Sequence, residues 1–200
     1  MIISIEGNIG SGKSTILSLL KDKYSDNPNI IFVDEPVSEW NNIKDNGKSI
    51  LELFYSDKEK FSFTFQILAY ITRLRKLLEV LKDSEDKVIV CERSIYTDKN
   101  VFAKMLHQQK YISDMEWKTY NYWFDTFKEQ TDLNYIVYVK TKPEICLNRI
   151  KKRNRTGESD IPLEYLLHCD ELHSEWLEKT EKNVIFFNGN QDLDDKNRYI

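Results

Sequence analysis

Short apolar runs alternate along the chain with longer segments in which apolar residues recur every three or four positions. The short runs have the length of strands and are rich in β-branched side chains. They lie at residues 2–5, 30–33, 87–91, 133–139 and 184–187. Because continuous apolar runs are typical of parallel strands covered on both faces, the alternation predicts an α/β fold with helices on both sides of a parallel sheet.

The longest helical segment is predicted over residues 58–81. Apolar residues spaced by four and three predict a buried stripe along it. This stripe consists of Ile67, Ile71, Leu74, Leu78 and Leu81. Gln66, Ala69 and Arg73 share another line of the same helix, because seven residues make nearly two turns. That line either faces a pocket or forms a solvated polar edge, and periodicity alone does not separate the two.

Two capping boxes predict further helix starts, at Ser113-x-x-Glu116 and at Thr141-x-x-Glu144 with a proline in the first turn. The helix after Ser113 carries aromatic residues on more than one side, so it is either wholly buried or part of a subunit interface. These aromatic residues are Trp117, Tyr120, Tyr122, Trp123, Phe124 and Phe127.

Composition and charge narrow the class of protein. The 200 residues, 40% of them hydrophobic and 31% charged, suit one soluble globular domain. The formal net charge of -4 leaves no basic surface for generic nucleic-acid binding. Cys91, Cys146 and Cys169 lack disulfide or metal spacing and predict free thiols in a reducing compartment. With no signal-peptide pattern and no membrane-length apolar run, a cytoplasmic protein without a membrane partner is expected.

The turn after the first strand carries the most specific motif. Gly7-x-x-x-x-Gly12-Lys13-Ser14 matches the phosphate-binding loop pattern and lies between an apolar run and a helical stripe. Glycine lets backbone N–H groups surround a polyphosphate, and the following helix N-terminus attracts the same anion. Lys13 is expected to reach the outer phosphates and Ser14 to bind Mg²⁺. The predicted nucleotide-binding residues are Gly7, Asn8, Ile9, Gly10, Ser11, Gly12, Lys13, Ser14 and Thr15.

Charged residues follow two further strands where each ends. Glu35 comes after the second strand, at the edge where open α/β sheets bind ligands, and is either a general base or a cap for the next turn. Glu92 and Arg93 follow the third strand, where an acid completes the Mg²⁺ site of phosphate-loop enzymes. The alternative is an idle surface pair. Asp98 lies about one helical turn after Ser94 and can face the same cleft.

A basic cluster occupies the end of the helix that follows Pro143. It consists of Arg149, Lys151, Lys152, Arg153 and Arg155. Guanidinium groups stabilise the charge of a transferring phosphoryl group bidentately, whereas a charge run of this kind can equally be a solvated face. Residues 156–160 break the helix, so a short arginine-rich lid is predicted over about 149–160. The loop after the last strand is able to pass over a nucleotide base.

Together these motifs resemble those of deoxynucleoside kinases of the deoxycytidine/deoxyguanosine kinase type, in the family's order and over nearly the whole chain. The motifs are Glu6 to Thr15, Glu35-Pro36-Val37 with Trp40, Phe61 to Gln66, Glu92-Arg93-Ser94 with Asp98, and Arg149 to Arg155 with Ile161 to Tyr165. The resemblance implies a P-loop NTPase-type three-layer sandwich with a five-stranded parallel sheet, forming one domain over residues 1–200. It also implies a homodimer and, with Mg²⁺, transfer of the γ-phosphate of ATP or another NTP to the 5′-hydroxyl of a deoxynucleoside for DNA-precursor salvage.

The resemblance further implies roles for individual residues. Glu35 would take the proton of the 5′-hydroxyl, Arg93 would orient it, and Ser14 and Glu92 would hold Mg²⁺. The groups that neutralise the transferring phosphoryl would be Lys13, Arg149, Arg153 and Arg155. The loop over the donor base would be Gln191, Asp192 and Leu193. The acceptor pocket would comprise Trp40, Phe54 and Phe65 as walls, Tyr55 and Glu158 at the sugar 3′-hydroxyl, and Gln66, Ala69, Arg73 and Asp98 around the base.

Asp98 only accepts hydrogen bonds and Arg73 only donates them, which favours deoxycytidine and the purine deoxynucleosides over thymidine. Two other functions compete with this reading. A thymidylate kinase-like nucleoside monophosphate kinase would need an extra positive group for the acceptor phosphate, which Glu35 would repel. A non-catalytic nucleotide switch would leave Glu35, the trio of Gln66, Arg73 and Asp98, and the arginine lid unexplained.

Overall fold

The computed structural model describes residues 1–84, 86–155, 157–158 and 161–191. Its strands are β1 (Ile2–Glu6), β2 (Ile30–Val33), β3 (Lys44–Asp45), β4 (Lys48–Ser49), β5 (Val88–Glu92), β6 (Tyr135–Lys140) and β7 (Asn183–Asn188). Its α-helices are α1 (Lys13–Lys23), α2 (Val37–Asn42), α3 (Ile50–Ser56), α4 (Lys58–Leu81), α5 (Ile95–Thr97), α6 (Lys104–Gln108), α7 (Asp114–Phe127), α8 (Pro143–Arg153) and α9 (Leu163–Lys179). A π-helical segment, η1 (Asp98–Ala103), joins α5 to α6, and a 3-10 turn, η2 (Lys128–Thr131), follows α7.

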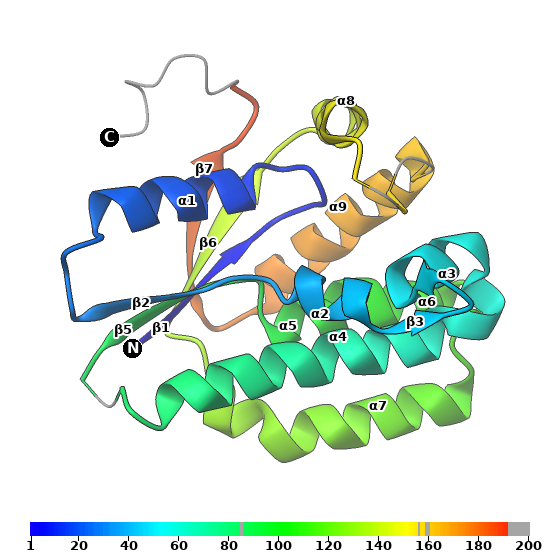
Figure 1. Cartoon of the computed structure of the whole chain (residues 1–200), viewed down its shortest axis with the longest axis horizontal. Helices are drawn as coiled ribbons and strands as arrows, with labels where there is room; N and C mark the ends of the chain where they lie inside the picture. Colours follow the sequence, from blue (N-terminus) through cyan, green and yellow to red (C-terminus); the bar gives the residue numbers. More distant parts are fainter. Residues whose placement is uncertain (85, 156, 159–160, 192–200) are drawn as a thin grey trace.

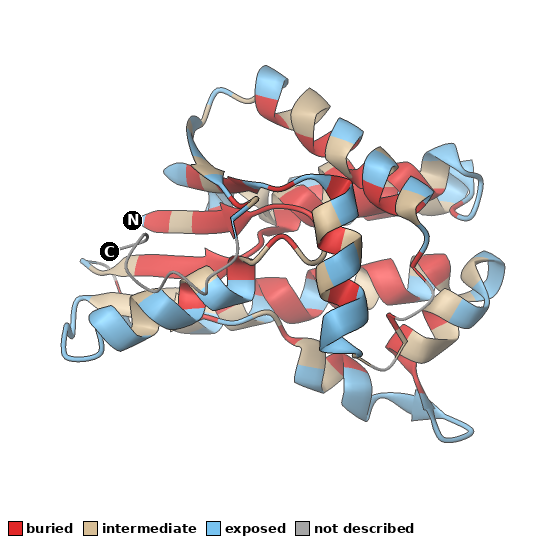
Figure 2. Ribbon diagram, turned by 90° about the horizontal axis from the view of Figure 1, so that it is seen from above, coloured by how far each residue is buried: buried red, intermediate tan, exposed pale blue. Residues whose placement is uncertain are grey.

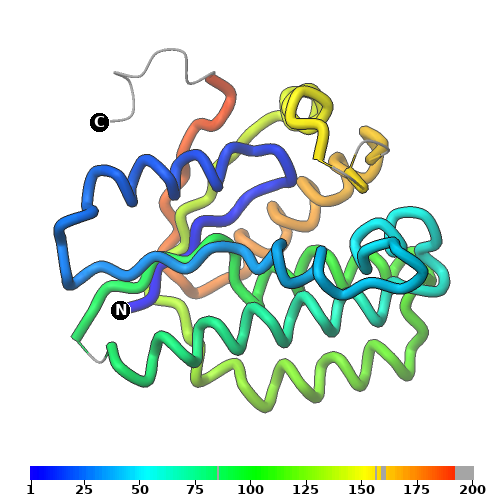
Figure 3. Tube along the Cα trace, viewed as in Figure 1, coloured from blue at the N-terminus to red at the C-terminus, as the bar shows by residue number. Residues whose placement is uncertain are grey.

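The main sheet has five strands in the order β2-β5-β1-β6-β7, and every neighbouring pair is parallel. The first strand lies in the middle, where Ile3 is opposite Val90 of β5 and Tyr135 of β6. Figure 3 shows this central position of the N-terminal strand. Parallel pairing brings the carboxyl ends of all five strands to one edge of the sheet. The predicted parallel sheet is therefore confirmed.

Helices cover both faces of the sheet (Figure 1). On one face, Leu17 of α1 packs with Ile5 and Val90. On the other face, Leu77 of α4 and Leu177 of α9 pack over the strands, and α7 lies outside α4. Buried residues follow the strands through the centre of the molecule (Figure 2). This three-layer arrangement explains the continuous apolar runs of the central strands β1, β5 and β6, which are mostly buried, whereas the edge strand β7 exposes Ile185 and Phe186.

Helix α4 has the predicted bounds, and its predicted stripe packs against the core except at one residue. Leu74 is buried, Ile67, Leu78 and Leu81 are partly buried against the core, and Ile71 is 40% exposed. The line that carries Gln66, Ala69 and Arg73 is buried as well, which rules out the solvated edge. Periodicity does not reveal this second buried line, because it carries polar side chains, and the charge of Arg73 is offset by Glu35 and Asp98 on other elements.

Helix α7 begins with the predicted capping box. The Ser113 hydroxyl accepts from the Glu116 N–H at 3.3 Å, and the Glu116 carboxylate accepts from the Ser113 N–H at 2.8 Å. The helix is not wholly buried, because Tyr122 is 76% exposed and Trp123 is 43% exposed. The wholly buried alternative for this aromatic helix is therefore wrong.

The second capping box is wrong. Helix α8 begins at Pro143, its N-cap is Lys142, and no side chain caps it. The Thr141 hydroxyl donates instead to the carbonyl of Ser11 at 3.0 Å, because the end of β6 runs beside the phosphate-binding loop. Thr141 therefore supports that loop rather than the helix that follows it.

All three cysteines are free thiols, as predicted. Cys91, Cys146 and Cys169 are all buried as free thiols. Burial raises the pKa of each of the three thiols, so none carries thiolate character at neutral pH. Across the described ranges, no helix combines the length and the apolar character needed to cross a bilayer.

Candidate active site

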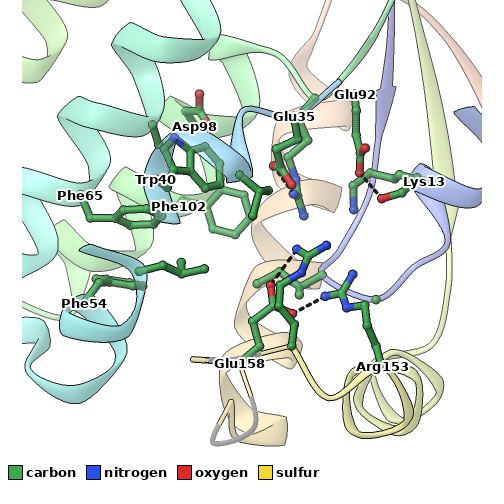
Figure 4. A pocket seen from close by; sticks show the side chains of 18 of the residues that line it. Lys13, Glu35, Trp40, Phe54, Phe65, Glu92, Asp98, Phe102, Arg153 and Glu158 are labelled. Carbon is green, nitrogen blue, oxygen red and sulfur yellow. Dashed lines mark hydrogen bonds and ion pairs between the residues drawn. The ribbon is translucent and has the colours of Figure 1, made fainter. Parts of the chain in front are cut away.

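A cavity of about 360 Å³ opens at the carboxyl edge of the sheet, where the sequence motifs converge (Figure 4). Its size suits a small-molecule ligand. The predicted site residues that line it are Ile9, Gly10, Gly12, Lys13, Ser14, Thr15, Glu35, Trp40, Phe54, Tyr55, Phe65, Gln66, Ala69, Arg73, Glu92, Arg93, Asp98, Arg149, Arg153, Arg155 and Glu158. Three loop residues, Gly7, Asn8 and Ser11, lie behind this surface, and Gln191 lies outside the lining. The predicted Asp192 and Leu193 fall outside the described residues.

The glycines of the phosphate-binding loop are required by its backbone. Gly7 has a φ of +147°, and a Cβ there would lie 2.8 Å from the carbonyl oxygen of Val139. Gly12 has a φ of +104° and is the N-cap of α1, so the amide groups of the first helical turn face the cavity end of the loop. Both positions are left-handed, where a side chain would be strained. The loop therefore has the backbone form of an anion-binding turn.

Lys13 and Ser14 follow at the start of α1 and face strand β5. Lys13 is buried and donates to the carbonyl of Asn8 at 2.7 Å. Burial lowers the pKa of Lys13 to about 7, and the charge of Arg93 acts in the same direction. A bound polyphosphate would restore the positive charge by supplying the missing counter-charge. The Ser14 hydroxyl donates to the Glu92 carboxylate at 2.6 Å.

The Ser14–Glu92 pair is a donor set that fits Mg²⁺. The cation prefers hard oxygen ligands and usually takes only one or two from the protein, with water and phosphate oxygens completing the octahedron. One hydroxyl and one carboxylate beside a phosphate-binding loop provide such a set. No larger cluster of His, Cys, Asp and Glu suited to a metal occurs in the described part of the chain.

Glu35 occupies the segment between β2 and α2 and is held by two arginines. Its Oε1 accepts from Arg93 at 2.6 Å and from Arg73 at 3.1 Å. Burial alone would raise the pKa of Glu35, but the charges of Arg93 and then Arg73 outweigh it and hold this pKa well below its usual range. The side chain does not cap α2, whose N-cap is Pro36. The capping alternative is therefore wrong, and Glu35 is an ionised carboxylate facing the cavity.

Arg93 connects the phosphate-binding loop to Glu35. Its backbone has a φ of +61°, an unusual conformation for a residue with a side chain, and its N–H donates to Ile5 at 3.0 Å. The guanidinium lies 5.1 Å from the centre of the Phe102 ring. Glu92 and Arg93 are each 6% exposed, so the surface-pair alternative is wrong. Backbone strain retained at such a turn is typical of functional sites.

Arg73 is the centre of a buried ion network. Its Nε donates to Asp98 at 2.9 Å, and its Nη1 donates to the carbonyl of Glu92 at 2.8 Å. Burial raises the pKa of Asp98, and the ion pair with Arg73 opposes this change. Gln66 lies on the same side of α4, and its buried Oε1 has no hydrogen-bond partner among the described residues. The cavity thus presents the Asp98 carboxylate as an acceptor, the Arg73 guanidinium as a donor, and the amide oxygen of Gln66 as a second acceptor.

Aromatic side chains form a slot beside this network. Phe54 and Phe65 are stacked with ring centres 4.8 Å apart, and Trp40 meets Phe65 edge-on at 5.4 Å. The indole N–H of Trp40 donates to the Thr72 hydroxyl at 2.9 Å, which fixes the ring. Figure 4 shows Trp40, Phe54 and Phe65 together on one side of the cavity, opposite Lys13 and Glu92. The slot suits a flat ring held between apolar faces.

The basic cluster is divided between two environments. Arg149 donates to the carbonyls of Gly189 at 2.8 Å and Gln191 at 2.9 Å, which ties α8 to the loop after β7. Lys151 and Lys152 are exposed and do not line the cavity. Arg153 and Arg155 do line it, and both pair with Glu158. The solvated-face alternative therefore holds for the lysines but not for the arginines.

Four lining residues are absent from the sequence-based site. They are Val37, Leu51, Phe102 and Tyr165. All four are apolar or aromatic wall residues, and although Val37 and Tyr165 stand in two of the quoted motifs, Leu51 and Phe102 stand in none. Phe102 follows Asp98 by four residues and Leu51 precedes Phe54 by three, so helical spacing from a predicted site residue was the available signal.

Comparisons with known proteins agree with this geometry. The family model described as "Deoxynucleoside kinase" matches residues 3–199. The chain is 38% identical to human deoxycytidine kinase over 196 residues, covering 88% of this chain and 74% of that protein. It is 35% identical to a probable deoxycytidine kinase of fowlpox virus over 204 residues, covering 98% and 82%. It is 31% identical to the mitochondrial deoxyguanosine kinase of Xenopus laevis over 205 residues, covering 93% and 76%.

These matches extend over the segments that carry the cavity, from the phosphate-binding loop to the arginine cluster. They support neither of the competing functions, the monophosphate kinase and the non-catalytic switch. The cavity adds an ionised carboxylate and an aromatic slot beside a loop built for phosphates. The chain therefore belongs to the deoxynucleoside kinase family and is an enzyme that transfers a phosphoryl group from a nucleoside triphosphate to a deoxynucleoside.

Proposed function

We propose that the cavity binds the deoxynucleoside with its base in the aromatic slot and its 5′-hydroxyl at Glu35. The observation that carries the proposal is the placement of Glu35 between the slot and the phosphate-binding loop, with Arg93 bound to it at 2.6 Å. Glu35 accepts the proton of the 5′-hydroxyl as the oxygen attacks the γ-phosphorus of ATP, and the bond between this phosphorus and the β–γ bridging oxygen breaks to release ADP. Arg93 holds Glu35 in place. Tyr55 and Glu158 bind the sugar 3′-hydroxyl.

The donor nucleotide is proposed to lie along the phosphate-binding loop. Lys13 pairs with the outer phosphates, and the loop amides surround them. Ser14 and Glu92 are the proposed ligands of Mg²⁺, which would screen the charge of the donor phosphates. Arg149 and Arg153 complete the donor site, with Arg155 beside them. The same proposal takes residues 1–200 as one kinase domain that acts in the cytoplasm.

The base preference is proposed from the donors and acceptors in the slot. Asp98 accepts from the exocyclic amine of cytosine or adenine, and Arg73 donates to a carbonyl such as that of guanine. Deoxycytidine and the purine deoxynucleosides are therefore the proposed acceptors. The printed names of relatives, deoxycytidine kinase and deoxyguanosine kinase, support this choice.

A turnover panel tests the proposed function. The purified protein is incubated with Mg·ATP and each of the four deoxynucleosides, and separately with the four monophosphates. We expect 5′-monophosphates to form from deoxycytidine and the purine deoxynucleosides, and chelation of Mg²⁺ to abolish the reaction. Phosphorylation of a monophosphate without phosphorylation of any nucleoside would refute the assignment of the acceptor.

Replacing Arg153 with alanine should lower kcat by more than tenfold while changing the acceptor KM little. The guanidinium fork acts mainly on charge that develops in the transition state, so its loss leaves ground-state binding largely intact. Arg149→Ala and Arg155→Ala should change kcat in the same direction. Lys151→Ala is the matched control, since Lys151 is exposed and outside the cavity. Equal effects of Lys151→Ala and Arg153→Ala, measured by steady-state kinetics, would contradict the proposal.

The protein is proposed to form a homodimer through α7 and the adjoining face of α4. Tyr122 and Met115 are 76% and 71% exposed, and Ile71 of α4 is 40% exposed. Such a concentration of apolar surface on one side of a helical layer marks an interface. Tyr122→Asp combined with Ile71→Asp should convert a dimer into a monomer in analytical ultracentrifugation. Tyr24→Asp, at the exposed aromatic residue that caps the C-terminal end of α1, is the control and should leave the dimer intact.

A further inference from the structure

One carboxylate, that of Glu158, pairs with two of the three arginines of the lid segment, Arg153 and Arg155. Its Oε2 pairs with Arg153, and its Oε1 accepts from Arg155 at 3.1 Å. The Glu158 side chain is 7% exposed, whereas the two arginine side chains are 35% and 32% exposed. Each carboxylate oxygen therefore binds a different guanidinium, and the carboxylate is the fixed member of the group. Figure 4 shows Arg153 meeting Glu158 at the mouth of the cavity.

The segment that carries Glu158 is seated against helix α3. Gly157 has a φ of +86°, and a Cβ there would lie 3.4 Å from Cγ of Glu52, at the first turn of α3. The backbone around Glu158 is closed by two hydrogen bonds, from its N–H to Arg155 and from the N–H of Ile161 to its carbonyl. Glu158 is thus positioned by main-chain contacts that do not depend on the arginine side chains.

Helix α3 also carries Tyr55, which places Glu158 next to the proposed sugar subsite. Burial raises the pKa of the Tyr55 phenol, and the negative charge of Glu158 raises it further, which reflects their proximity. A carboxylate offers about four hydrogen-bonding positions, and the two guanidinium groups engage one on each oxygen. Positions remain for a sugar hydroxyl, so one carboxylate can serve the sugar and the arginines at the same time.

We propose that Glu158 is a positioning residue that orients Arg153 and Arg155 toward the donor phosphates and thereby couples the sugar subsite to the phosphate subsite. The proposal rests on the proposed function, in which Glu158 binds the sugar 3′-hydroxyl and the arginines act on the transferring phosphoryl group. It adds that the 3′-hydroxyl affects the rate of transfer, and not only acceptor binding, because it binds the carboxylate that fixes both arginines.

Loss of this carboxylate should slow phosphoryl transfer without weakening the binding of the donor. Free arginine side chains have several rotatable bonds, so without an anchor the two forks no longer hold one orientation toward the reacting phosphate. Removing a negative charge near the triphosphate also strengthens the general attraction between the site and ATP. Transfer should therefore slow while donor binding is unchanged or tighter, a combination that simple loss of folded structure does not produce.

The test replaces Glu158 with glutamine, which keeps the shape but has one acceptor oxygen and one donor amide. At saturating deoxycytidine, kcat should fall at least tenfold, while the Kd of ATP measured calorimetrically without acceptor should stay the same or decrease. Glu164→Gln, at an exposed carboxylate in the first turn of α9, is the control and should change neither value. A kcat within twofold of the unmodified protein, or an ATP Kd that rises tenfold, would overturn the proposal.

A second measurement leaves Glu158 unchanged. The kcat for deoxycytidine is divided by the kcat for its 3′-deoxy analogue, in the unmodified protein and in Arg153→Ala. We expect this ratio to be at least threefold smaller in Arg153→Ala, because the hydroxyl acts partly through that arginine. Equal ratios in the two proteins would overturn the coupling. If the analogue matched deoxycytidine in both KM and kcat in the unmodified protein, the proposed sugar contact itself would fail, which is a separate outcome.

Discussion

Replacing Glu35 with glutamine is expected to lower kcat by about 10²–10⁴-fold, the usual contribution of a general base, and to change acceptor affinity only a few-fold. Glutamine keeps the size of the side chain but cannot take the proton of the 5′-hydroxyl. The proposed mechanism assigns that proton to Glu35, which lies at the cavity with Arg93 at 2.6 Å and Arg73 at 3.1 Å. Single-turnover kinetics and equilibrium titration with deoxycytidine would measure the two quantities separately.

Glu39→Gln is the matched control, since Glu39 lies one helical turn further on, outside the cavity, and pairs with Arg75. Its kcat should stay within twofold of the unmodified protein. The two arginines that keep Glu35 ionised also weaken it as a base, so the fall in kcat is expected toward the lower end of the range of about 10²–10⁴-fold. Normal turnover in Glu35→Gln would remove this residue from the mechanism.

Thymidine is expected to be a poor acceptor, by as much as about 10⁴-fold in kcat/KM relative to deoxycytidine, because buried polar groups left mispaired discriminate strongly. In the buried network, Nε of Arg73 donates to Oδ2 of Asp98 at 2.9 Å. Thymine would direct a carbonyl toward the carboxylate and place its methyl group where these side chains fill space. Arg73→Met combined with Asp98→Ala should narrow the gap by removing both charges and opening room.

The quantity to measure is the ratio of kcat/KM values for the two nucleosides. Arg73 also binds Glu35 at 3.1 Å, so the double variant is expected to lose turnover with every acceptor. The ratio cancels this loss, because both nucleosides share it. Thymidine activity alone would fall even where the discrimination between the two nucleosides had narrowed. Lys76→Met, at a residue of the same helix outside the cavity, is a control that should leave the ratio unchanged. Thymidine as the best acceptor of the unmodified protein would contradict the assignment of these residues to the base.

The fold could be predicted where local sequence and tertiary environment agree. The run at 30–33 coincides with β2, and the segment 58–81 coincides with α4. The first is a continuous apolar run and the second is a long segment with helical periodicity. The two-stranded hairpin of β3 and β4 and the short helix α3 were not predicted, although Ser49 and Glu52 form a capping box at the start of α3. Helix α3 has only 7 residues, too few for a clear helical period, so periodicity gave no reason to look for a helix there.

The site residues could be predicted where the chemistry requires a sequence motif, but not where tertiary packing alone brings them to the cavity. The loop from Gly7 to Ser14 has a fixed pattern, because backbone and phosphate geometry dictate its residues. By contrast, the alternatives for Gln66 and Arg73 stayed open until their burial was known, since the elements that bury them come from distant parts of the chain. The pairing of Glu158 with two arginines depends on side-chain direction, which spacing along the sequence does not specify.

The central position of β1 has a consequence for biosynthesis. The strand that leads into the phosphate-binding loop is made before both of its partners, β5 and β6, and β6 ends only at Lys140. The loop therefore cannot reach its final form until β6 has emerged from the ribosome, on the order of ten seconds after β1 is made. Until then the apolar side chains of β1 have no sheet to join, and ATP cannot stabilise the growing chain. A nascent chain of this kinase should depend on holding chaperones most strongly before β6 appears.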